Sequence, residues 1–591
     1  MSIYVIDGSE LYSYVVSGAK NIIVNEANLN KINFFPVPDG DTGTNLSLTM
    51  NSILSSASHD PHVSSTMKSI SDIASDHAYG NSGMIFAQYF SGLSQALSSK
   101  EFLTPEEFVA SLKSSAAFAF RSVTNPKEGT ILTVMREWAN HLETHLEDDF
   151  TQRIELSLVH LKNAVQKTKQ QMKVLREHNV VDAGAMAFYY FVEGIAKFLK
   201  VRTLDDRQYK AAVLEEVSEN LASLDIGEYR YCTQFLVRSK SDLEKIRTEL
   251  SGMGDSLVLG SGDDHISVHL HTNHPQQVMK RLLEEGTVTS HKVDDMYLQA
   301  RLIHQPVAKT VIVTDSIADL PQRFIDDNQI VVIPLNLIVD SVVYMDKLTM
   351  KPEDFYDKLD DYTMNPTSSQ ATPQLIERIF RQLLQNYDQI LGIFVSSKMS
   401  GTFDRIVSVS DALRKEGKQI EILDSKVNSA AQGLLIIEAA NLRKAGADFT
   451  ELVAFMKKRI DDVRIYVSVK DLKYMLKGGR VSKTTGFILS KLKLQPVISI
   501  DRNGKGEIFA KSLTQKSAMK TILKTLRNDF QTKGIDRYAL VYADDPEDLT
   551  DFRRQCESML GKAPDYIETI SPIVGLNAGK GAIAIAYLTK T

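Results

Sequence analysis

Two aspartates and two glycines stand directly before a predicted helix near the start of the chain. In the segment 35–45, FPVPDGDTGTN, Asp39 and Asp41 lie two residues apart, and the residues that follow, 46–58, have a helical pattern. The start of a helix offers unpaired backbone N–H groups that favour phosphate, and carboxylate oxygens favour Mg²⁺. The spacing therefore predicts a metal–nucleotide site, with an Asx turn that merely caps the helix as the alternative.

A second loop with two glycines precedes another predicted helix. Gly80-Asn81-Ser82-Gly83 stands before the apolar-periodic run 84–97. Two such helix starts, one acidic and one neutral, suit a Mg²⁺-bridged polyphosphate better than two independent caps. Neither loop ends in the Gly-Lys-Ser/Thr of a Walker A sequence.

These loops, with Glu128-Gly129-Thr130 and the VDAG segment 181–184, resemble the nucleotide-binding (DhaL-type) domain of dihydroxyacetone kinases. They are most similar to its relative in bacterial fatty acid kinase. The resemblance implies an all-α barrel of antiparallel helices that holds ATP and Mg²⁺ and catalyses phosphotransfer through Asp39 and Asp41. Asn33 stands near the place of the family's third aspartate and is a predicted metal ligand. The predicted nucleotide-binding residues are Thr44, Asn45, Asn81, Ser82, Gly83, Glu128, Gly129, Thr130 and Asp182.

The first 200 residues have the apolar spacing of helices, notably over 105–122, 131–145 and 153–172. Asp182 precedes another apolar run, so a role as a helix cap and a role in the nucleotide site both stay open. The aromatic residues 188–191 are expected to pack in the core.

A mixed α/β pattern begins near residue 226, after the charged segment 203–210. In the predicted strand that contains Val268-His269-Leu270-His271, both histidines point to one face, and Cys232 lies in another predicted strand. One thiolate and two imidazoles form a plausible Zn²⁺ ligand set, and a buried cysteine beside an unrelated histidine pair is the alternative. The segment also resembles the middle domain of fatty acid kinase, which implies that Cys232, His269 and His271 bind a metal.

From about residue 308, short apolar runs alternate with amphipathic helices such as 373–387, a pattern typical of a parallel α/β sheet. Ligands of such sheets bind at the carboxyl ends of the strands, where this chain carries hydroxyl-rich loops. The predicted ligand-binding residues in these loops are Thr314, Asp315, Ser316, Ser368, Ser400, Gly401 and Thr402.

The motifs VTDSIADLP, TSSQATP, SSKMSGTF, ILDSK, LKYMLKGGRVS and GLNAGKGAIAIAY resemble, in order, those of the DegV family of fatty-acid-binding proteins. The resemblance implies that Ser368 and Ser400 hydrogen-bond a fatty acid carboxylate whose tail fills a tunnel. Two positions depart from the family pattern. Asn577, a further predicted lipid-binding residue, replaces a usual histidine, and Leu513 replaces a frequent arginine.

The length of 591 residues indicates several domains, which we place at 1–205, 206–305 and 306–591. A net charge of −6 argues against nucleic-acid binding. Two cysteines, no apolar run long enough to span a membrane and no signal peptide predict a cytoplasmic protein that contacts membranes only transiently from solution.

A kinase module followed by an acyl carrier predicts that ATP phosphorylates a bound fatty acid to an acyl phosphate. Transfer within one chain, between the chains of a homodimer and to separate DegV-type carriers all stay open. The alternatives are a kinase for a small molecule such as dihydroxyacetone and a non-catalytic lipid-binding or sensing protein.

Overall fold

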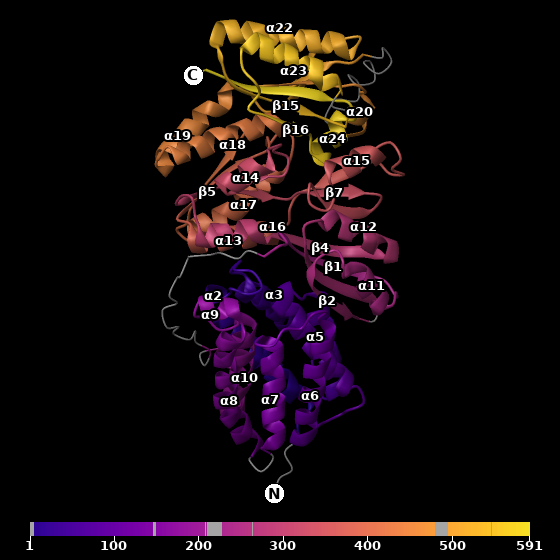
Figure 1. Ribbon diagram of the computed structural model, residues 1–591, viewed down its shortest axis with the longest axis vertical. Coiled ribbons are helices and arrows are strands. Elements are labelled where there is room, and N and C mark those ends of the chain that lie inside the picture. The colour runs from indigo at the N-terminus through magenta and orange to yellow at the C-terminus, as the bar shows by residue number, and fades with distance from the viewer. Residues whose placement is uncertain are drawn as a thin grey trace. The chain divides into compact units, whose positions relative to one another are not determined.

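The computed structural model describes residues 5–145, 149–206, 209, 227–262, 264–478, 494–544 and 547–590 (Figure 1). These residues form two compact units, Met1–His304 and Gln305–Thr591. Parts of two segments singled out in the sequence lie outside the described residues, namely 207, 208 and 210 of the charged segment and 479–482 of LKYMLKGGRVS.

The first part of the first unit is all-helical, as predicted. Helix α6 begins at Pro105 because Thr104 and Glu107 form a reciprocal capping box. Apolar faces of the helices meet in one core that includes Phe188 and Phe191, so the aromatic cluster is confirmed as core packing. The helices are α1 (Gly8–Val24), α2 (Glu26–Lys31), α3 (Thr42–Ser56), α4 (Val63–Asp76), α5 (Gly80–Ala96), α6 (Pro105–Ser122), α7 (Ile131–Thr144), α8 (Phe150–Gln171), α9 (Lys173–Glu177) and α10 (Ala183–Val201).

The remainder of the first unit is a small α/β domain. Its described strands form an antiparallel sheet in the order β2-β3-β1-β4. The sequence predicted β1 to β3 and α12 but not β4, α11 or α13. The elements are β1 (Tyr231–Arg238), α11 (Leu243–Leu250), β2 (Asp255–Ser261), β3 (His265–Thr272), α12 (Pro275–Glu285), β4 (Thr287–Asp295) and α13 (Met296–His304).

The second unit begins with a parallel sheet in the order β11-β10-β5-β6 and a small antiparallel sheet, β8-β7-β9. The elements are β5 (Thr310–Asp315), α14 (Gln322–Asn328), β6 (Ile330–Ile333), β7 (Asn336–Val339), β8 (Val342–Met345), α15 (Pro352–Lys358), β9 (Thr367–Ser369), α16 (Pro373–Asn386), β10 (Gln389–Phe394), α17 (Thr402–Lys415), β11 (Gln419–Asp424), α18 (Ser429–Lys444) and α19 (Phe449–Arg459).

A second large sheet of this unit has the order β14-β13-β12-β17-β15-β16. Here the expectation of parallel sheets needs correction, because among the described pairs only β15 and β16 run parallel. The elements are β12 (Val463–Ser468), α20 (Lys473–Gly478), β13 (Val497–Ile500), β14 (Gly506–Ala510), α22 (Gln515–Lys533), β15 (Ile535–Tyr542), α23 (Glu547–Leu560), β16 (Tyr566–Thr569), α24 (Pro572–Ala578) and β17 (Ile583–Thr589).

Within the described residues, no helix combines the length and the apolar character needed to cross a bilayer.

Candidate functional site

The acidic loop leads into α3. Asp41 is the N-cap residue of α3, yet its side chain makes no capping hydrogen bond. The loop is also covered by the middle domain, since His304 Nε2 lies 3.0 Å from the Pro38 carbonyl oxygen. Gly40 has φ +63°, and a Cβ there would lie 2.6 Å from Ile303 Cδ1. The capping alternative therefore finds no support at Asp41.

Two residues predicted to bind a ligand near this loop, Asn33 and Thr44, make hydrogen bonds within the protein. Asn33 is buried, its Oδ1 accepts the Thr42 N–H at 2.8 Å, and its Nδ2 donates to the Val37 carbonyl at 3.0 Å. Thr44 donates its hydroxyl to Glu26 Oε1 at 3.0 Å and its N–H to Asn30 Oδ1 at 3.1 Å. These contacts hold the loop in shape, so both side chains have a structural role that the sequence analysis did not foresee.

The start of α5 also lacks a side-chain cap. Its N-cap residue, Tyr79, provides no side-chain cap for the first turn, which contains Asn81, Ser82 and Gly83. Gly80 has φ +63°, and a Cβ there would lie 2.6 Å from Asn45 Nδ2. The two predicted nucleotide loops are thus neighbours, with buried Asn45 between them. Uncapped N–H groups at a helix start favour a phosphate group.

The Glu128-Gly129-Thr130 segment forms the turn before α7. Glu128 binds Arg136 Nη2 at 2.7 Å, and this hydrogen bond lowers the pKa of the Glu128 carboxyl. The Gly129 N–H donates to Thr133 Oγ1 at 2.9 Å, and Thr130 Oγ1 donates to the Lys127 carbonyl at 2.8 Å. These contacts give the three residues a local structural role, and nucleotide binding by them stays a prediction.

Asp182 joins two helix starts. Its Oδ1 accepts the N–H of Ala185 at 2.7 Å, which caps α10, and the N–H of Ile131 at 3.1 Å, which begins α7. Burial raises the pKa of its carboxyl to about 6. The capping role left open by the sequence is thus present in the structure.

This pKa gives a stability prediction for Asp182→Asn. The pKa of Asp182 in the folded protein lies above the ordinary value of 3.8. The free energy of unfolding of the wild type therefore falls as pH rises from about 4 to about 6, by at most about 3 kcal/mol. The asparagine variant keeps an acceptor oxygen but does not titrate, so its stability relative to wild type should increase over that range. Trp138, the chain's single tryptophan, packs against Phe188 of α10, and its fluorescence during urea unfolding measures the difference. A constant difference from pH 4 to 7 would contradict the assignment.

One polar face of the middle-domain sheet lies against the nucleotide loops. In the strand register, Cys232 of β1 pairs with His271 of β3 and with Asp294 of β4. The Asn81 side chain lies 3.4 Å from His271 Nε2, and Gln234 in β1 donates to the Ala78 carbonyl. The register thus places a thiol, imidazoles and a carboxylate beside the start of α5.

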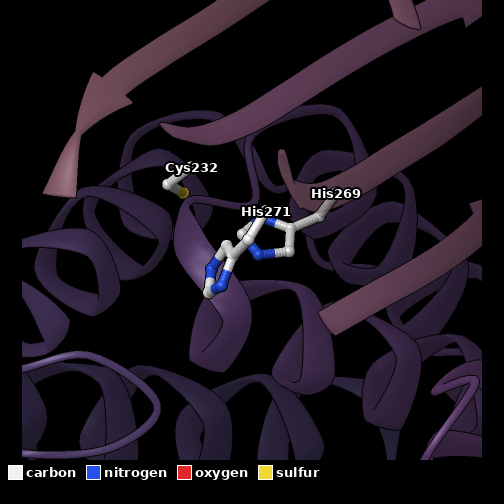
Figure 2. A group of neighbouring side chains, drawn as sticks. All are labelled: Cys232, His269 and His271. Atoms are coloured by element: carbon white, nitrogen blue, oxygen red, sulfur yellow. The ribbon is translucent and has the colours of Figure 1, made fainter. Parts of the chain in front are cut away.

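Cys232, His269 and His271 form a buried group that could bind a metal, with their ligand atoms within 4.8 Å of one another (Figure 2). Both ring nitrogens of His269 are buried without a hydrogen-bond partner among the described residues. Burial lowers the pKa of His269 well below its usual value, so the ring is neutral. A neutral, unpartnered imidazole is the form that binds a metal ion.

Three carboxylates gather next to this group. Asp39 is buried, and burial together with the nearby charges of Asp41 and Asp294 raises its pKa well above the ordinary value. A concentration of negative charge out of water fits a divalent cation, which would remove that penalty. Sequence reasoning missed Asp294 and its neighbour Lys292. The sequence offered little signal for either residue, because the segment 287–295 is polar at almost every position and only Val288 and Val293 are apolar.

The second unit contains a cavity of about 880 Å³. Ile317, Leu335 and Val395, which follow strands β5, β6 and β10, line one part of it, as expected for the carboxyl ends of a parallel sheet. Aliphatic side chains of β12 and β13, such as Ile465 and Ile498, line another part. The cavity is large enough for a long apolar ligand.

The predicted lipid-binding residues divide into two sets. Ser368, Ser400, Gly401, Thr402 and Asn577 line the cavity, and Asn577 Oδ1 is buried there without a partner among the described residues. Thr314, Asp315 and Ser316 are absent from this lining. They are buried, and their side chains bind the Ile393 carbonyl and the N–H groups of Val395 and Leu335. Leu513, which stands where the DegV family frequently has an arginine, is 74% exposed and so lies at the surface.

Models of three families match three segments of the chain. A model described as "uncharacterised protein, DegV family" matches residues 309–590. A DegV domain-containing protein of Caldanaerobacter subterraneus subsp. tengcongensis is 30% identical over 285 residues, which cover 48% of this chain and 99% of that protein. The chain belongs to the DegV family. Ahead of its DegV part, a DAK2 domain matches residues 36–197, and a middle domain like that of fatty acid kinase matches residues 228–303.

Two further comparisons each cover about half of this DegV-family chain. An uncharacterized protein of Staphylococcus haemolyticus is 30% identical over 310 residues, covering 50% of this chain and 56% of that protein. The chain thus spans about half the length of this curated relative. A crystal structure described as DegV, a fatty acid binding protein from Bacillus subtilis, is 27% identical, covers 48% of this chain and 99% of that chain, and has a TM-score of 0.44.

Proposed function

We propose that this chain is an ATP-dependent fatty acid kinase that carries its lipid-binding domain in the same polypeptide. The observation that carries the proposal is the gathering of Asp39, Asp41 and Asp294 beside the uncapped start of α5. That arrangement suits a metal-bound polyphosphate, and the cavity in the DegV part suits the acyl chain. The succession of DAK2, fatty acid kinase-like and DegV segments supports the pairing of the two sites.

The proposed reaction joins a carboxylate oxygen of the fatty acid to the γ-phosphorus of ATP and breaks the bond from that phosphorus to the β,γ-bridging oxygen. The products are an acyl phosphate and ADP. A carboxylate is ionised at neutral pH, so the chain needs no general base to activate it. Its own residues have the task of positioning the donor and stabilising charge on the phosphoryl oxygens.

Asp39, Asp41 and Asp294 would hold Mg²⁺, which when bound neutralises charge on the phosphates. At the lipid site, Ser368, Ser400 and Thr402 supply hydroxyl donors, and α17 begins at Thr402 without a side-chain cap. Arg405, in the second turn of α17, lines the same cavity. Hydroxyls, a helix start and a guanidinium together favour an anionic head group.

The reaction is tested by incubating the full chain with ATP, Mg²⁺ and oleate and trapping acyl phosphate with hydroxylamine. Acyl hydroxamate formed in proportion to ADP, without an added carrier protein, supports the proposal. Hydroxamate that forms only when a separate DegV-type carrier is added places the acceptor on that carrier. ATP turnover with dihydroxyacetone but not with oleate contradicts the acyl reaction, and bound lipid without any turnover indicates a sensor.

The buried thiol and imidazoles are proposed to hold Zn²⁺, which accepts one sulfur and two nitrogen ligands. Cys232→Ala is expected to reduce the zinc retained after dialysis from about one ion per chain to near zero, because the thiolate is lost. Cys556→Ala is the matched control, since Cys556 is the chain's other cysteine and lies in a separate apolar core. Metal analysis by inductively coupled plasma mass spectrometry measures both. Equal zinc in the two variants would contradict the site.

A further inference from the structure

Lys292 of the middle domain lies between the two predicted nucleotide loops of the helical domain. Its Nζ is 3.2 Å from Oδ1 of Asn45, which lies near the start of α3. The same atom is 5.7 Å from the centre of the Tyr79 ring, and Tyr79 is the N-cap residue of α5. The Lys292 side chain is only 13% exposed. A cation is thus held, largely out of water, beside both helix starts.

The strand register explains how Lys292 reaches this place. Lys292 pairs with Gln234 of β1, and Gln234 pairs with His269 of β3, so the three lie in one row across the sheet. Gln234 donates to the Ala78 carbonyl, just before the start of α5. The row therefore docks on the 78–83 loop, and the rigid sheet fixes where the ammonium group lies.

The charged groups around Lys292 indicate what its ammonium group can bind. Lys292 forms an ion pair with Asp294, and it acts on Asp39 electrostatically. A divalent cation on Asp39, Asp41 and Asp294 would compensate most of their charge and leave the ammonium able to pair with an added anion. An ammonium group binds phosphate oxygens as a point charge, and its effect is strong where water is excluded.

We propose that Lys292 is a phosphate-binding residue that the middle domain supplies to the nucleotide site, and that it contacts the γ-phosphoryl group of ATP. This inference rests on the proposed function, because it assumes a nucleoside triphosphate at the start of α5. The contact would stabilise charge on the phosphoryl group as it leaves ADP. The middle domain then acts in phosphotransfer itself as well as in metal binding.

The test compares Lys292→Gln with Lys292→Arg in the full chain. Glutamine keeps a donor for Asn45 Oδ1 but removes the charge, whereas arginine keeps the charge. Isothermal titration calorimetry with Mg²⁺ should show that Lys292→Gln weakens ATP binding by about 10-fold or more and ADP binding by less than about 2-fold. The kcat for acyl phosphate formation should fall by about 100-fold, with partial recovery in Lys292→Arg. Lys280→Gln, on the exposed face of α12, is the control.

Other outcomes overturn the inference. Equal loss of ATP and ADP affinity, or no loss of either, would mean that Lys292 does not contact the γ-phosphoryl group. A fall in the urea midpoint of Trp138 fluorescence, shared by both Lys292 variants and without nucleotide selectivity, would reduce Lys292 to a structural ion pair. If the wild-type chain binds neither nucleotide, the proposed function fails as well. If the wild-type chain binds ATP and the Lys292 variants bind ATP equally well, the Lys292 inference fails but the proposed function does not.

Discussion

Replacing Asp41 with Asn is expected to lower kcat/KM for ATP-dependent acyl phosphate formation by about 100-fold or more. The carboxylate lies at the start of α3 without capping it, and its charge helps to raise the pKa of Asp39. Asparagine keeps the shape of the side chain and removes one of the charges that would hold Mg²⁺ beside the phosphates. Hydroxamate trapping over a range of ATP and Mg²⁺ concentrations measures the effect.

The Mg²⁺ dependence separates this role from a loss of folding. Asp41→Asn should need a higher Mg²⁺ concentration for half-maximal rate, while its unfolding, followed by Trp138 fluorescence, should match that of wild type. Asp72→Asn is the control, because Asp72 makes a half-exposed ion pair with Lys68 on α4. A wild-type rate and Mg²⁺ response in Asp41→Asn would exclude the acidic loop from the metal site.

Local signals in the sequence predicted many of the elements. Helix α6 spans the predicted residues 105–122 because its cap and first proline lie next to it in the sequence. The segment 329–340, QIVVIPLNLIVD, is a single run of mostly apolar residues, yet it forms β6 and β7 in two different sheets. Pro334 lies between them and has no N–H to donate to a continuous ladder.

Only part of the candidate site could be predicted from the sequence. Asp39 and Asp41 were predicted from residue type and short spacing. Cys232, His269 and His271 were predicted from residue type, the strand pattern and the resemblance to the middle domain of fatty acid kinase. Whether an oxygen faces a ligand or the protein's own backbone depends on contacts between distant residues. The Asn33 amide binds its own loop, and the Thr44 hydroxyl binds Glu26. Asp294 and Lys292 were missed because only the register of β4 against β1 brings them to the site.

The second large effect is expected at the cavity of the DegV part. Val467 on β12 lines this cavity, so Val467→Phe should fill part of the space available to an acyl chain. Each methylene that loses its apolar contact costs about 0.8 kcal/mol, so excluding about four of them weakens binding by about 3 kcal/mol, or on the order of 100-fold. Displacement of a fluorescent fatty acid by oleate measures the change in affinity.

Fatty acids of different length give a sharper test of whether the tail lies in this cavity. Octadecanoate should lose more affinity than decanoate in Val467→Phe, because the longer tail needs more of the 880 Å³ cavity. ATP binding should stay unchanged, since the substitution lies in the other compact unit. Val343→Phe, at a residue that is 41% exposed on β8, controls for the added ring. Equal losses for both chain lengths would indicate that the phenylalanine disturbs the fold, and unchanged affinity for both would mean that the tail lies elsewhere.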